Sequence, residues 1–345
     1  MIKVSIAGAT GYTGLELLRL LIQHPKVKIQ TLTAETHAGK NISEVAPSLT
    51  GWLDQPLEKL NPSVAKECDV LFLCLPHTTS MEQVPALTQE SCRVIDLSAD
   101  YRLHDGDVYN QWYKTTHLNP ELLQDWVYGL PELHREALRG AKHVANPGCY
   151  PTGAILALAP VMKEAWADSD SIIIDSKSGV SGAGRKLSLS THFCETNEGV
   201  SAYGLGEHRH TPEIEQELSA LAGKSIIVSF SPHLMPMTRG ILTTAYVPLK
   251  NKMDRETLHA HFTRYYEKEP FVRILPPGRY ANTHSVAGSN YCDIGVQADA
   301  RTGRAVITSA IDNLMKGASS QAIQNMNLMM GWEETLGLDA PPLFP

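Results

Sequence analysis

The chain has no run of lysines and arginines, and its 30 basic residues are outnumbered by 37 acidic ones, for a formal net charge of −7. This balance provides no basic surface for a nucleic-acid backbone. Long hydrophobic stretches are also absent, because apolar runs such as Val70–Leu75 are too short to cross a bilayer and instead predict buried strands. We therefore expect neither nucleic acid nor a membrane among the partners of this chain.

Cysteine is scarce, with six in 345 residues, and no two of them form a CxxC pair. Their number and spacing do not suit a disulfide scaffold. The sequence opens directly into a strand-like run, Ile2–Ile6, without a basic segment followed by a hydrophobic signal core. We therefore expect a cytoplasmic protein in which all but one of the cysteines are reduced, mostly structural thiols. These are Cys68, Cys74, Cys92, Cys194 and Cys292.

The length of 345 residues exceeds what one hydrophobic core usually supports, so two domains are expected. In the first 150 residues, apolar strand-like runs alternate with helical patterns, which predicts βαβ units and a parallel sheet. These runs are Val4–Ala7, Leu15–Ile22, Val27–Thr33, Val70–Leu75, Met81–Leu87 and Val94–Leu97. The fold class predicted for this part is α/β of the Rossmann type.

From residue 171 onward, long β-branched runs are separated by few helical patterns, which predicts an α+β domain with a mixed or antiparallel sheet. The strand-like runs are Ser171–Asp175, Ile226–Phe230, Ile241–Val247, Cys292–Ala298 and Ala305–Ile311. The helical patterns are Pro212–Leu221 and Arg255–Lys268. A final stretch rich in Ala, Met, Leu and Gln, Asn313–Met330, predicts one long helix.

One cysteine, Cys149, stands at a predicted junction between a strand and a helix. Lys142–Ala145 has the pattern of a short strand, Pro147 and Gly148 of a tight turn, and Pro151 suits a first helical turn. Unpaired amides and the helix dipole favour a thiolate at such a position. Cys149 is therefore the candidate nucleophile, and the alternative is a buried cysteine that packs as a small hydrophobic residue.

A glycine-rich segment, Gly8–Gly14, follows the first predicted strand and leads into a helical pattern. Glycines allow a tight turn and close approach of the backbone to a pyrophosphate, which rests on the helix N-terminus. The predicted cofactor-binding residues of this segment are Gly8, Thr10, Gly11, Tyr12, Thr13 and Gly14. The alternative is a plain turn between a strand and a helix.

The end of the second predicted strand bears on the choice of cofactor. Enzymes that use NAD usually place an acidic residue at this tip to bind the ribose 2′-hydroxyl, whereas here the tip is Thr33-Ala34. The hydroxyl groups of Thr33 and Thr36 and the charge of Lys40 could hold a 2′-phosphate instead, so we expect NADP(H). Glu35 keeps the alternative of NAD open.

A cluster of polar residues in Gly206–Ile214 offers the proton-transfer group that a cysteine nucleophile needs. It contains two histidines, His208 and His210, with Arg209 between them, and Glu213, which could orient a histidine ring. The two histidines could also bind a metal, but no third ligand stands at a characteristic spacing, so no metal is predicted. Purely structural histidines are the remaining alternative.

Three further segments are candidates for the site. Arg102 follows a predicted strand toward its carboxyl end and could clamp a phosphate or carboxylate, or be a surface arginine. The Gly/Ser-rich stretch Ser178–Arg185, with Ser178 and Gly179 as predicted cofactor ligands, borders the nicotinamide or is a flexible connection. Pro76, after the run Val70–Leu75, is also placed among the cofactor-binding residues.

Together these segments resemble the N-acetyl-γ-glutamyl-phosphate reductase family along essentially the whole chain. The segments that carry the resemblance are Gly8–Gly14, Val144–Gly153 continuing to Pro160, Ser178–Arg185, His208–Ile214, Pro232–Leu234, Arg239-Gly240 and Asp312–Gly317. The resemblance implies a discontinuous NADP domain, 1–149 with 313–345, closed by the returning C-terminal helix. It also implies that 150–312 forms a substrate-binding and oligomerisation domain, and that the protein is a homo-oligomer, a dimer or a tetramer.

The resemblance also implies roles for individual residues. Cys149 corresponds to the acylated nucleophile, His208 to the acid/base, and Glu213 to a carboxylate that supports this histidine, while Asn313 corresponds to an asparagine near the nicotinamide. Arg102, Arg209 and His210 are the predicted substrate-binding residues. Where many family members carry a Ser-Arg-type pair for the 2′-phosphate, this chain has Ala34-Glu35-Thr36, so the ligands that select NADP need not be the usual ones.

The implied reaction is the NADPH-dependent reduction of N-acetyl-γ-glutamyl phosphate through a Cys149 thioester, which belongs to arginine biosynthesis. Reduction of a related acyl phosphate, aspartyl phosphate or carrier-linked aminoadipyl phosphate, is the alternative that leaves the chemistry unchanged. A non-catalytic NADP-binding regulator would lack the thiol or the acid/base, whereas Cys149 and His208 are both present. A metal hydrolase that uses His208 and His210 would instead hold zinc.

Overall fold

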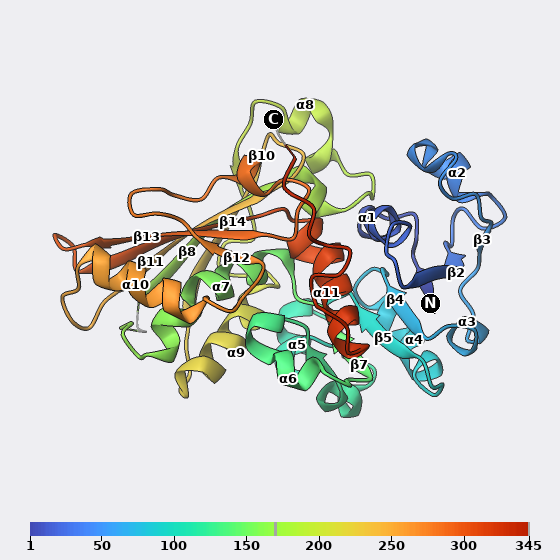
Figure 1. The fold of residues 1–345 in the computed structure, drawn as a ribbon, viewed down its shortest axis with the longest axis horizontal. Coiled ribbons are helices and arrows are strands. Elements are labelled where there is room, and N and C mark those ends of the chain that lie inside the picture. The colour runs from blue at the N-terminus through green and yellow to red at the C-terminus, as the bar shows by residue number, and fades with distance from the viewer. Residues whose placement is uncertain (169–170, 344–345) are drawn as a thin grey trace. The chain divides into compact units, whose positions relative to one another are not determined.

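The computed structural model describes residues 1–168 and 171–343 and divides the chain into two compact units (Figure 1). Unit 1 consists of Met1–Pro147 and Ala318–Ala340, and unit 2 of Gly148–Gly317 and Pro341–Pro345. Cys149 thus belongs to unit 2, whereas the sequence-based domain boundary follows residue 149. The end of the expected segment 313–345 includes residues 344 and 345, which lie outside the described residues.

Unit 1 contains a parallel seven-stranded sheet in the order β3-β2-β1-β4-β5-β7-β6. Its central strand β4 pairs in register with β1, Val70 opposite Val4, and β4 is buried along its whole length, as expected for a parallel sheet that is covered on both faces. The strands are β1 (Ile2–Ala7), β2 (Val27–Thr33), β3 (Leu57–Glu58), β4 (Val70–Leu73), β5 (Arg93–Asp96), β6 (Val127–Tyr128) and β7 (His143–Ala145). This sheet confirms the predicted Rossmann-type α/β class.

Helices complete unit 1, and one of them comes from the far end of the sequence. This helix, α11, packs against α1, α6 and β5 (Figure 1). The helices are α1 (Tyr12–Leu21), α2 (Ile42–Val45), α3 (Ser63–Lys66), α4 (Thr79–Leu87), α5 (Gly106–Tyr113), α6 (Pro131–Leu138) and α11 (Ser320–Met329). The C-terminal part of the chain therefore completes the unit that the N-terminal part begins.

Unit 2 contains a mixed seven-stranded sheet in the order β12-β13-β14-β11-β8-β10-β9. β8 and β10 are parallel, as are β12 and β13, and the remaining pairs are antiparallel. The strands are β8 (Ile172–Gly179), β9 (Ser201–Ala202), β10 (Val228–Met235), β11 (Ile241–Pro248), β12 (Val272–Ile274), β13 (Cys292–Asp299) and β14 (Arg304–Ile311). This confirms the predicted second α+β part with a mixed sheet.

Helices α7, α9 and α10 pack on this mixed sheet, with α7 against β11 and β14 at its centre. The alternate residues of β11 are buried and half-buried, as expected for a sheet with one covered face. The helices of unit 2 are α7 (Cys149–Lys163), α8 (Phe193–Thr196), α9 (Thr211–Ala222) and α10 (Arg255–Tyr265). Within residues 1–168 and 171–343, no helix has both the length and the apolar character needed to span a bilayer.

The prediction of one helix over Asn313–Met330 is wrong in its first part. The structure has a π-helical turn at Met315–Ser319, and the α-helix begins only at Ser320. The amide of Gly317 donates to the carbonyl of Asp312, five residues earlier, and the Asp312 carboxylate accepts from the amide of Leu314. These bonds depend on a buried aspartate, and a helical composition pattern does not reveal them.

Candidate active site

Cys149 is the first residue of α7 and is half-buried. Gly148 precedes the helix in an extended conformation and, as a glycine, has no side chain with which to cap it. Pro151 lies in the first turn, where its missing N–H leaves no hydrogen bond unmade. The predicted junction of strand and helix is therefore present, and the open helix N-terminus favours a negative charge on the sulfur.

Two side-chain hydrogen bonds hold Gly148, the residue directly before Cys149. The amide of Gly148 donates to Oε1 of Glu213 at 2.7 Å, and its carbonyl accepts from Oγ1 of Thr152 at 3.0 Å. Glu213 lies in the first turn of α9 and is only 1% exposed. Glu213 therefore bonds directly to the backbone beside Cys149, although the two bonded residues are 65 positions apart in the sequence. The predicted role of Glu213, support of His208, does not include this contact.

Arg102 of unit 1 is buried, so the alternative of a surface arginine is wrong. The residue is 5% exposed, and its Nε donates to the carbonyl of Asn146 at 2.7 Å and its Nη2 to the carbonyl of Leu97 at 2.9 Å. The side chain of Asn146 is held as well, by Nδ2 of Asn325 at 3.0 Å and by the carbonyl of Ala318 at 3.1 Å. These bonds fix the end of the segment that leads to Cys149.

His208 is enclosed by aromatic rings. The centroids of Tyr150, Tyr203, Phe230 and His210 lie 5.5, 5.5, 5.3 and 4.9 Å from that of His208, each with a steep angle between the ring planes. Nδ1 of His208 accepts a hydrogen bond from the backbone amide of His210 at 3.1 Å. A neutral His208 ring therefore carries its proton on Nε2.

Burial and the neighbouring charge of Arg209 lower the pKa of His208 to about 4. The ring is therefore mainly neutral at pH 7. The hydroxyls of Tyr150 and Tyr203 are 2.9 Å apart, and burial raises the pKa of Tyr203 to about 12. Both phenols stay protonated at neutral pH, so they can only act as neutral hydrogen-bonding groups.

His210 and Arg209 stand next to His208 at the start of α9. His210 is half-buried and its ring contacts that of Tyr150, with centroids 5.9 Å apart, whereas Arg209 is exposed. Among the described residues, no group of three or more His, Cys, Asp or Glu side chains forms a metal-binding cluster. The structure brings the two predicted histidines together around Tyr150, the neighbour of Cys149.

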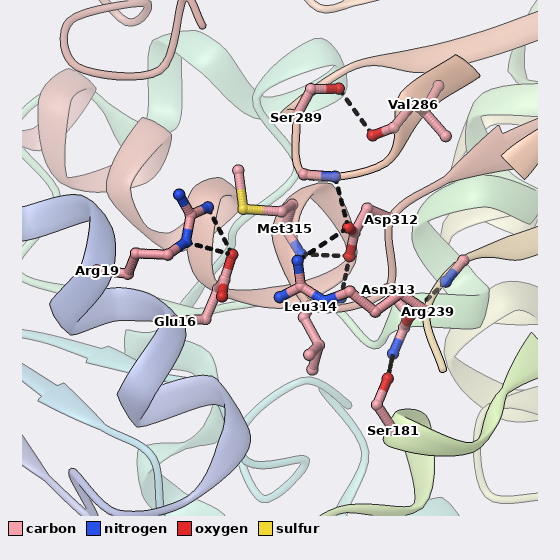
Figure 2. A network of polar contacts seen from close by, with 12 residues as sticks. Glu16, Arg19, Ser181, Arg239, Val286, Ser289, Asp312, Asn313, Leu314 and Met315 are labelled. Atoms are coloured by element: carbon pink, nitrogen blue, oxygen red, sulfur yellow. Dashed lines mark hydrogen bonds and ion pairs between the residues drawn. The ribbon is translucent and has the colours of Figure 1, made fainter. Parts of the chain in front are cut away.

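Asn313 bridges two loops of unit 2 through its side chain (Figure 2). Its Oδ1 accepts from the amide of Gly240 at 2.7 Å, and its Nδ2 donates to Oγ of Ser181 at 2.9 Å. A Cβ atom on Gly179 would lie 2.8 Å from the backbone of Thr238, so only glycine fits there. The part of Ser178–Arg185 next to β8 is therefore held in place rather than being a flexible connection.

Sequence reasoning gave no separate role to Asp312, which organises the loop before the π-helical turn. Its Oδ2 accepts from Nη1 of Arg239 at 3.3 Å and from the amide of Gly288 at 2.8 Å, and its Oδ1 from the amide of Leu314 at 2.9 Å (Figure 2). The residue is fully buried. The sequence signal that could have identified Asp312 is a polar residue directly after an apolar strand-like run.

The predicted dinucleotide segment of unit 1 has the expected geometry. Gly8 adopts a φ of +83°, and the amides of Gly8 and Ala9 donate to the carbonyl of Thr33. A Cβ atom on Gly14 would meet the backbone of Ala9 at 2.8 Å. Gly11 is the N-cap of α1, which begins with Tyr12, and has no side chain at this helix start, a position where helices commonly bind anions.

At the tip of β2, the side chains differ in accessibility. Thr33 is 1% exposed, so the expectation that its hydroxyl holds a 2′-phosphate is wrong. Thr36 and Lys40 are exposed, and Oγ1 of Thr36 lies 3.1 Å from Nδ1 of His37. Glu35 is exposed and forms an ion pair with Lys59 at 3.3 Å, which partly neutralises the acidic residue next to the tip.

Pro76 is exposed in the turn after β4. Asp100, which the sequence analysis did not identify, holds this turn in place. Asp100 accepts from the amides of Thr78 and Met81 at 2.9 and 3.0 Å, at the start of α4. Thr78 has a φ of +71°, which is unusual for a β-branched residue. The Pro76 turn is thus a rigid feature of the carboxyl edge of the sheet.

Comparison with known proteins identifies the family. Residues 3–141 match the model described as "Semialdehyde dehydrogenase, NAD binding domain", and residues 149–313 match "Semialdehyde dehydrogenase, dimerisation domain". Proteins named N-acetyl-gamma-glutamyl-phosphate reductase from Desulforamulus reducens and Geobacter sp. are each 54% identical over 100% of both chains.

Solved structures support the fold. Aspartate semialdehyde dehydrogenase II of Vibrio cholerae, complexed with ASA, matches with a TM-score of 0.73 at 17% identity, over 96% of this chain and 98% of that chain. The Candida albicans aspartate semialdehyde dehydrogenase with NADP matches with a TM-score of 0.70 at 16% identity, over 96% and 98%. The fold, the helix that begins at Cys149 and the full-length identity agree, and the chain belongs to the N-acetyl-γ-glutamyl-phosphate reductases of the semialdehyde dehydrogenase family.

Proposed function

We propose that this oxidoreductase reduces N-acetyl-γ-glutamyl phosphate to N-acetylglutamate 5-semialdehyde and phosphate, a step of arginine biosynthesis. The single observation that carries the proposal is the half-buried thiol of Cys149 at a helix N-terminus whose capping residue is a glycine, in a chain 54% identical to reductases of this name over its full length. Such a thiol is a suitable nucleophile toward an acyl phosphate, because phosphate is a good leaving group.

In the proposed first step, Sγ of Cys149 forms a bond to the acyl carbon, and the bond from that carbon to the phosphate oxygen breaks. Phosphate leaves with the electron pair, and the substrate stays on the enzyme as a thioester. The first amides of α7 lie beside this position and stabilise both the thiolate and the negative oxygen that develops on the carbonyl. The bond from Gly148 to Glu213 keeps this helix start in place.

Reduced nicotinamide, when bound, supplies the hydride that converts the thioester to the oxidation level of the aldehyde. His208 is the proposed partner of the oxygen: its Nε2–H donates a hydrogen bond to the oxyanion, which becomes the carbonyl of the aldehyde as the bond between carbon and Sγ breaks. The amide of His210 supports this role because it keeps the proton of His208 on Nε2. Cys149 returns as a thiolate, and the aldehyde leaves.

His210 is the alternative proton-transfer group. With a pKa of about 4, His208 is rarely protonated at pH 7, so it works through its neutral N–H rather than as a strong acid. His210 precedes Thr211, the first residue of α9, and Glu213 in the first turn of this helix contacts the backbone beside Cys149. The kinetic comparison of the two histidines, described below, separates these assignments.

For the dinucleotide we propose Gly8, Thr10, Gly11, Tyr12, Thr13 and Gly14 as the pyrophosphate loop. The crowding at Gly8 and Gly14 and the uncapped start of α1 fit a pyrophosphate. We further propose NADP(H) over NAD(H), with the 2′-phosphate held by Thr36 and Lys40, which are both exposed. Pro76 is the proposed neighbour of the cofactor at the edge of the sheet.

Three residues of unit 2, Ser178, Gly179 and Asn313, are the further proposed ligands of the nicotinamide half. The fixed geometry of this loop supports the proposal, since the side chain of Asn313 hydrogen-bonds to both Gly240 and Ser181. A rigid loop can present its backbone to a ring without first losing conformational freedom.

For the substrate we propose Arg209 and His210 as direct ligands, because Arg209 is exposed and both adjoin His208. Arg102 is proposed to contribute positive charge from a buried position. Its hydrogen bonds to the carbonyls of Asn146 and Leu97 also give it a role in holding the segment before Cys149. Guanidinium groups of this kind bind anionic substrate groups through charge-assisted hydrogen bonds.

We propose that the protein is a cytoplasmic homo-oligomer, a dimer or a tetramer, in which the first domain, 1–149 with 313–345, binds the dinucleotide. The second domain, 150–312, binds substrate and mediates assembly. The matched dimerisation-domain model over 149–313 and the exposed apolar side chains of Ile227 and Phe193 support the role in assembly. The six free cysteines are compatible with a reducing compartment.

One assay tests the proposed reaction in reverse: phosphate-dependent reduction of NADP with N-acetylglutamate 5-semialdehyde. Aspartate semialdehyde and aminoadipate semialdehyde on its carrier protein are measured side by side. A higher kcat/KM with either of these two would identify it as the substrate in place of the proposed one. No turnover with any of the three would indicate that the chain is a non-catalytic dinucleotide-binding regulator. Activity that a chelator abolishes would point to metal chemistry instead.

A further inference from the structure

Two cysteines that the proposed reaction does not use lie together in unit 1. Cys68 precedes β4 and Cys92 precedes β5, and the two side chains are only 8% and 1% exposed. Both belong to one hydrophobic cluster, together with Val64 of α3, Leu87 of α4 and Val94 of β5. Cysteines that enter a core from adjacent strands are candidates for a covalent link as well as for packing.

The pairing of the two strands brings these residues within reach of each other. Val70 of β4 pairs with Arg93 of β5, and the amide of Arg93 donates to the carbonyl of Asp69 at 2.9 Å. Each cysteine is therefore next to a residue that takes part in the same backbone ladder. Because Val70 pairs with Arg93, Cys92 stands opposite Asp69, and Cys68 is offset from Cys92 by one position. For neighbouring strands about 4.8 Å apart, this offset is compatible with the Cα separation of about 4.4–6.8 Å that a disulfide spans.

The two thiols also influence each other's ionisation. Sγ of Cys68 donates a hydrogen bond to the carbonyl of Val64 at 3.2 Å. The hydrogen bond from Cys92 lowers the pKa of the Cys68 thiol, and the same bond together with burial raises that of Cys92. Cys74, in contrast, is half-buried, and burial raises the pKa of its thiol to about 12. Cys68 is therefore the thiol of this core that is suited to react first.

We propose that Cys68 and Cys92 form a modification site, a dithiol that small peroxides convert to an intramolecular disulfide. The Cys68 thiolate attacks one peroxide oxygen, the O–O bond breaks, and the leaving hydroxide takes a proton to become water. Cys92 then attacks the resulting sulfenic sulfur: the S–S bond forms, the S–O bond breaks, and the hydroxyl leaves as water with the proton of Cys92. Two thiols are oxidised and one peroxide is reduced to two waters.

The link would close a loop that contains β4, the Pro76 turn and α4. Because a disulfide restricts the unfolded chain, the oxidised form should unfold at a higher temperature than the reduced form. The proposal concerns only the chemistry of this pair, so it holds or fails independently of the substrate that Cys149 takes.

The test uses the full-length Cys149→Ser protein, so that the nucleophile does not consume peroxide. Protein treated with hydrogen peroxide is digested without reductant and analysed by mass spectrometry. We expect a linked pair of peptides containing Cys68 and Cys92, two hydrogens lighter than the free pair, that dithiothreitol separates. Thiol titration should show the loss of two thiols per chain.

Variants of each cysteine complete the test. Cys92→Ser should remove the linked peptides and leave Cys68 as a sulfenic acid that dimedone traps, whereas Cys292→Ser, a substitution of a buried cysteine in unit 2, should leave the linked peptides unchanged. If Cys92→Ser fails to fold, mapping of the parent protein still decides. The proposal is overturned if Cys68 and Cys92 both remain free thiols when two equivalents of peroxide have been consumed, or if either links to a different cysteine.

Discussion

Gly317 and Cys149 touch across unit 2: a Cβ atom built on Gly317 would lie 2.9 Å from the Cβ atom of Cys149. Gly317 lies in the π-helical turn, where its amide donates to the carbonyl of Asp312 at 3.0 Å. No real Cβ pair sits so close, and both residues are held by backbone bonds. Because Gly317 has no side chain, Cys149 can occupy its observed position.

Gly317→Ala should displace Cys149 and lower kcat/KM by about 100-fold, since a shift near 1 Å of a reacting group has an effect of this size. The rate of alkylation of Cys149 by iodoacetamide should change as well. The matched control is Gly199→Ala, because a Cβ atom there would meet nothing closer than 3.7 Å. Equal kinetics of the two variants would show that the Gly317 contact is not needed.

Cys149→Ser should leave the fold and NADP binding intact and remove nearly all turnover, because a hydroxyl is far less nucleophilic than a thiolate. Iodoacetamide should label Cys149 before the other five cysteines, including the exposed Cys194, and substrate should protect it. More than about a tenth of the wild-type rate in the serine variant is incompatible with the covalent route, which should supply several kcal/mol of barrier lowering.

His208→Asn should lower kcat by about 10²–10⁴-fold with little change in NADP affinity, in line with the usual contribution of proton transfer. The same change at His210 is expected to be milder. Each variant removes one imidazole from the same site, so each serves as the control for the other. A larger loss of kcat at His210 would assign proton transfer to that ring.

The low pKa of His208 also predicts a pH effect on stability. The folded-state pKa of about 4 lies below the ordinary value of 6.5, so between these values the unfolded chain binds more protons than the folded one. The contribution of His208 to the free energy of unfolding is therefore fully present above pH 6.5 and is lost as the pH falls toward 4. Urea unfolding across this window should show a shallower decline for His208→Asn than for the parent, and parallel curves would disprove the shift.

Lys40→Ala should weaken NADP without changing NAD and so reduce the preference by up to about tenfold, equivalent to about 1.4 kcal/mol. The physical reason is the loss of an exposed positive charge beside the 2′-phosphate. Lys66→Ala, at another exposed lysine, is the control. Equal weakening of both cofactors would mean that Lys40 acts on the pyrophosphate or the fold, and a wild-type preference for NAD would indicate Glu35 as a ribose ligand.

Arg102→Leu should raise the KM for phosphate or the semialdehyde, or lower kcat/KM for both, while nucleotide binding is retained. The buried bonds to Asn146 and Leu97 add a second expectation, a lower melting temperature, because two carbonyls lose their donors. Arg102→Lys keeps the charge without the planar group and separates the two effects. A melting-temperature loss with unchanged substrate kinetics would leave Arg102 a purely structural role.

The sequence was most informative where local chemistry decides the structure. The strand Val27–Thr33 was predicted with its observed bounds, because its apolar pattern and flanking residues act over a few positions. The helix start at Cys149 followed from the glycine before it and the proline in its first turn. The glycines of the segment Gly8–Gly14 were assigned for a close approach, and the crowding around Gly8 and Gly14 agrees with it.

Sequence reasoning failed where a residue's surroundings come from distant parts of the chain. The burial of Arg102 depends on the carbonyl of Asn146, 44 positions away, and the bond from Glu213 to Gly148 spans 65 positions. The short strand Leu57–Glu58 has too few residues for a period to be visible. Thr33 was judged accessible from its place at a strand tip, but the glycine turn packs against it through the bonds of Gly8 and Ala9.

The division of the chain between the two units has a consequence for biosynthesis. About 170 residues, Gly148–Gly317, are made between the first and the second part of unit 1. At a ribosomal rate of about 5–20 residues per second, the β-sheet of unit 1 waits roughly 10–30 s for α11, its last helix. Until then the surfaces of α1 and α6 that α11 covers are exposed on the nascent chain. The N-terminal part of unit 1 therefore depends on a helix that is translated later, and loss of α11 would leave these surfaces uncovered.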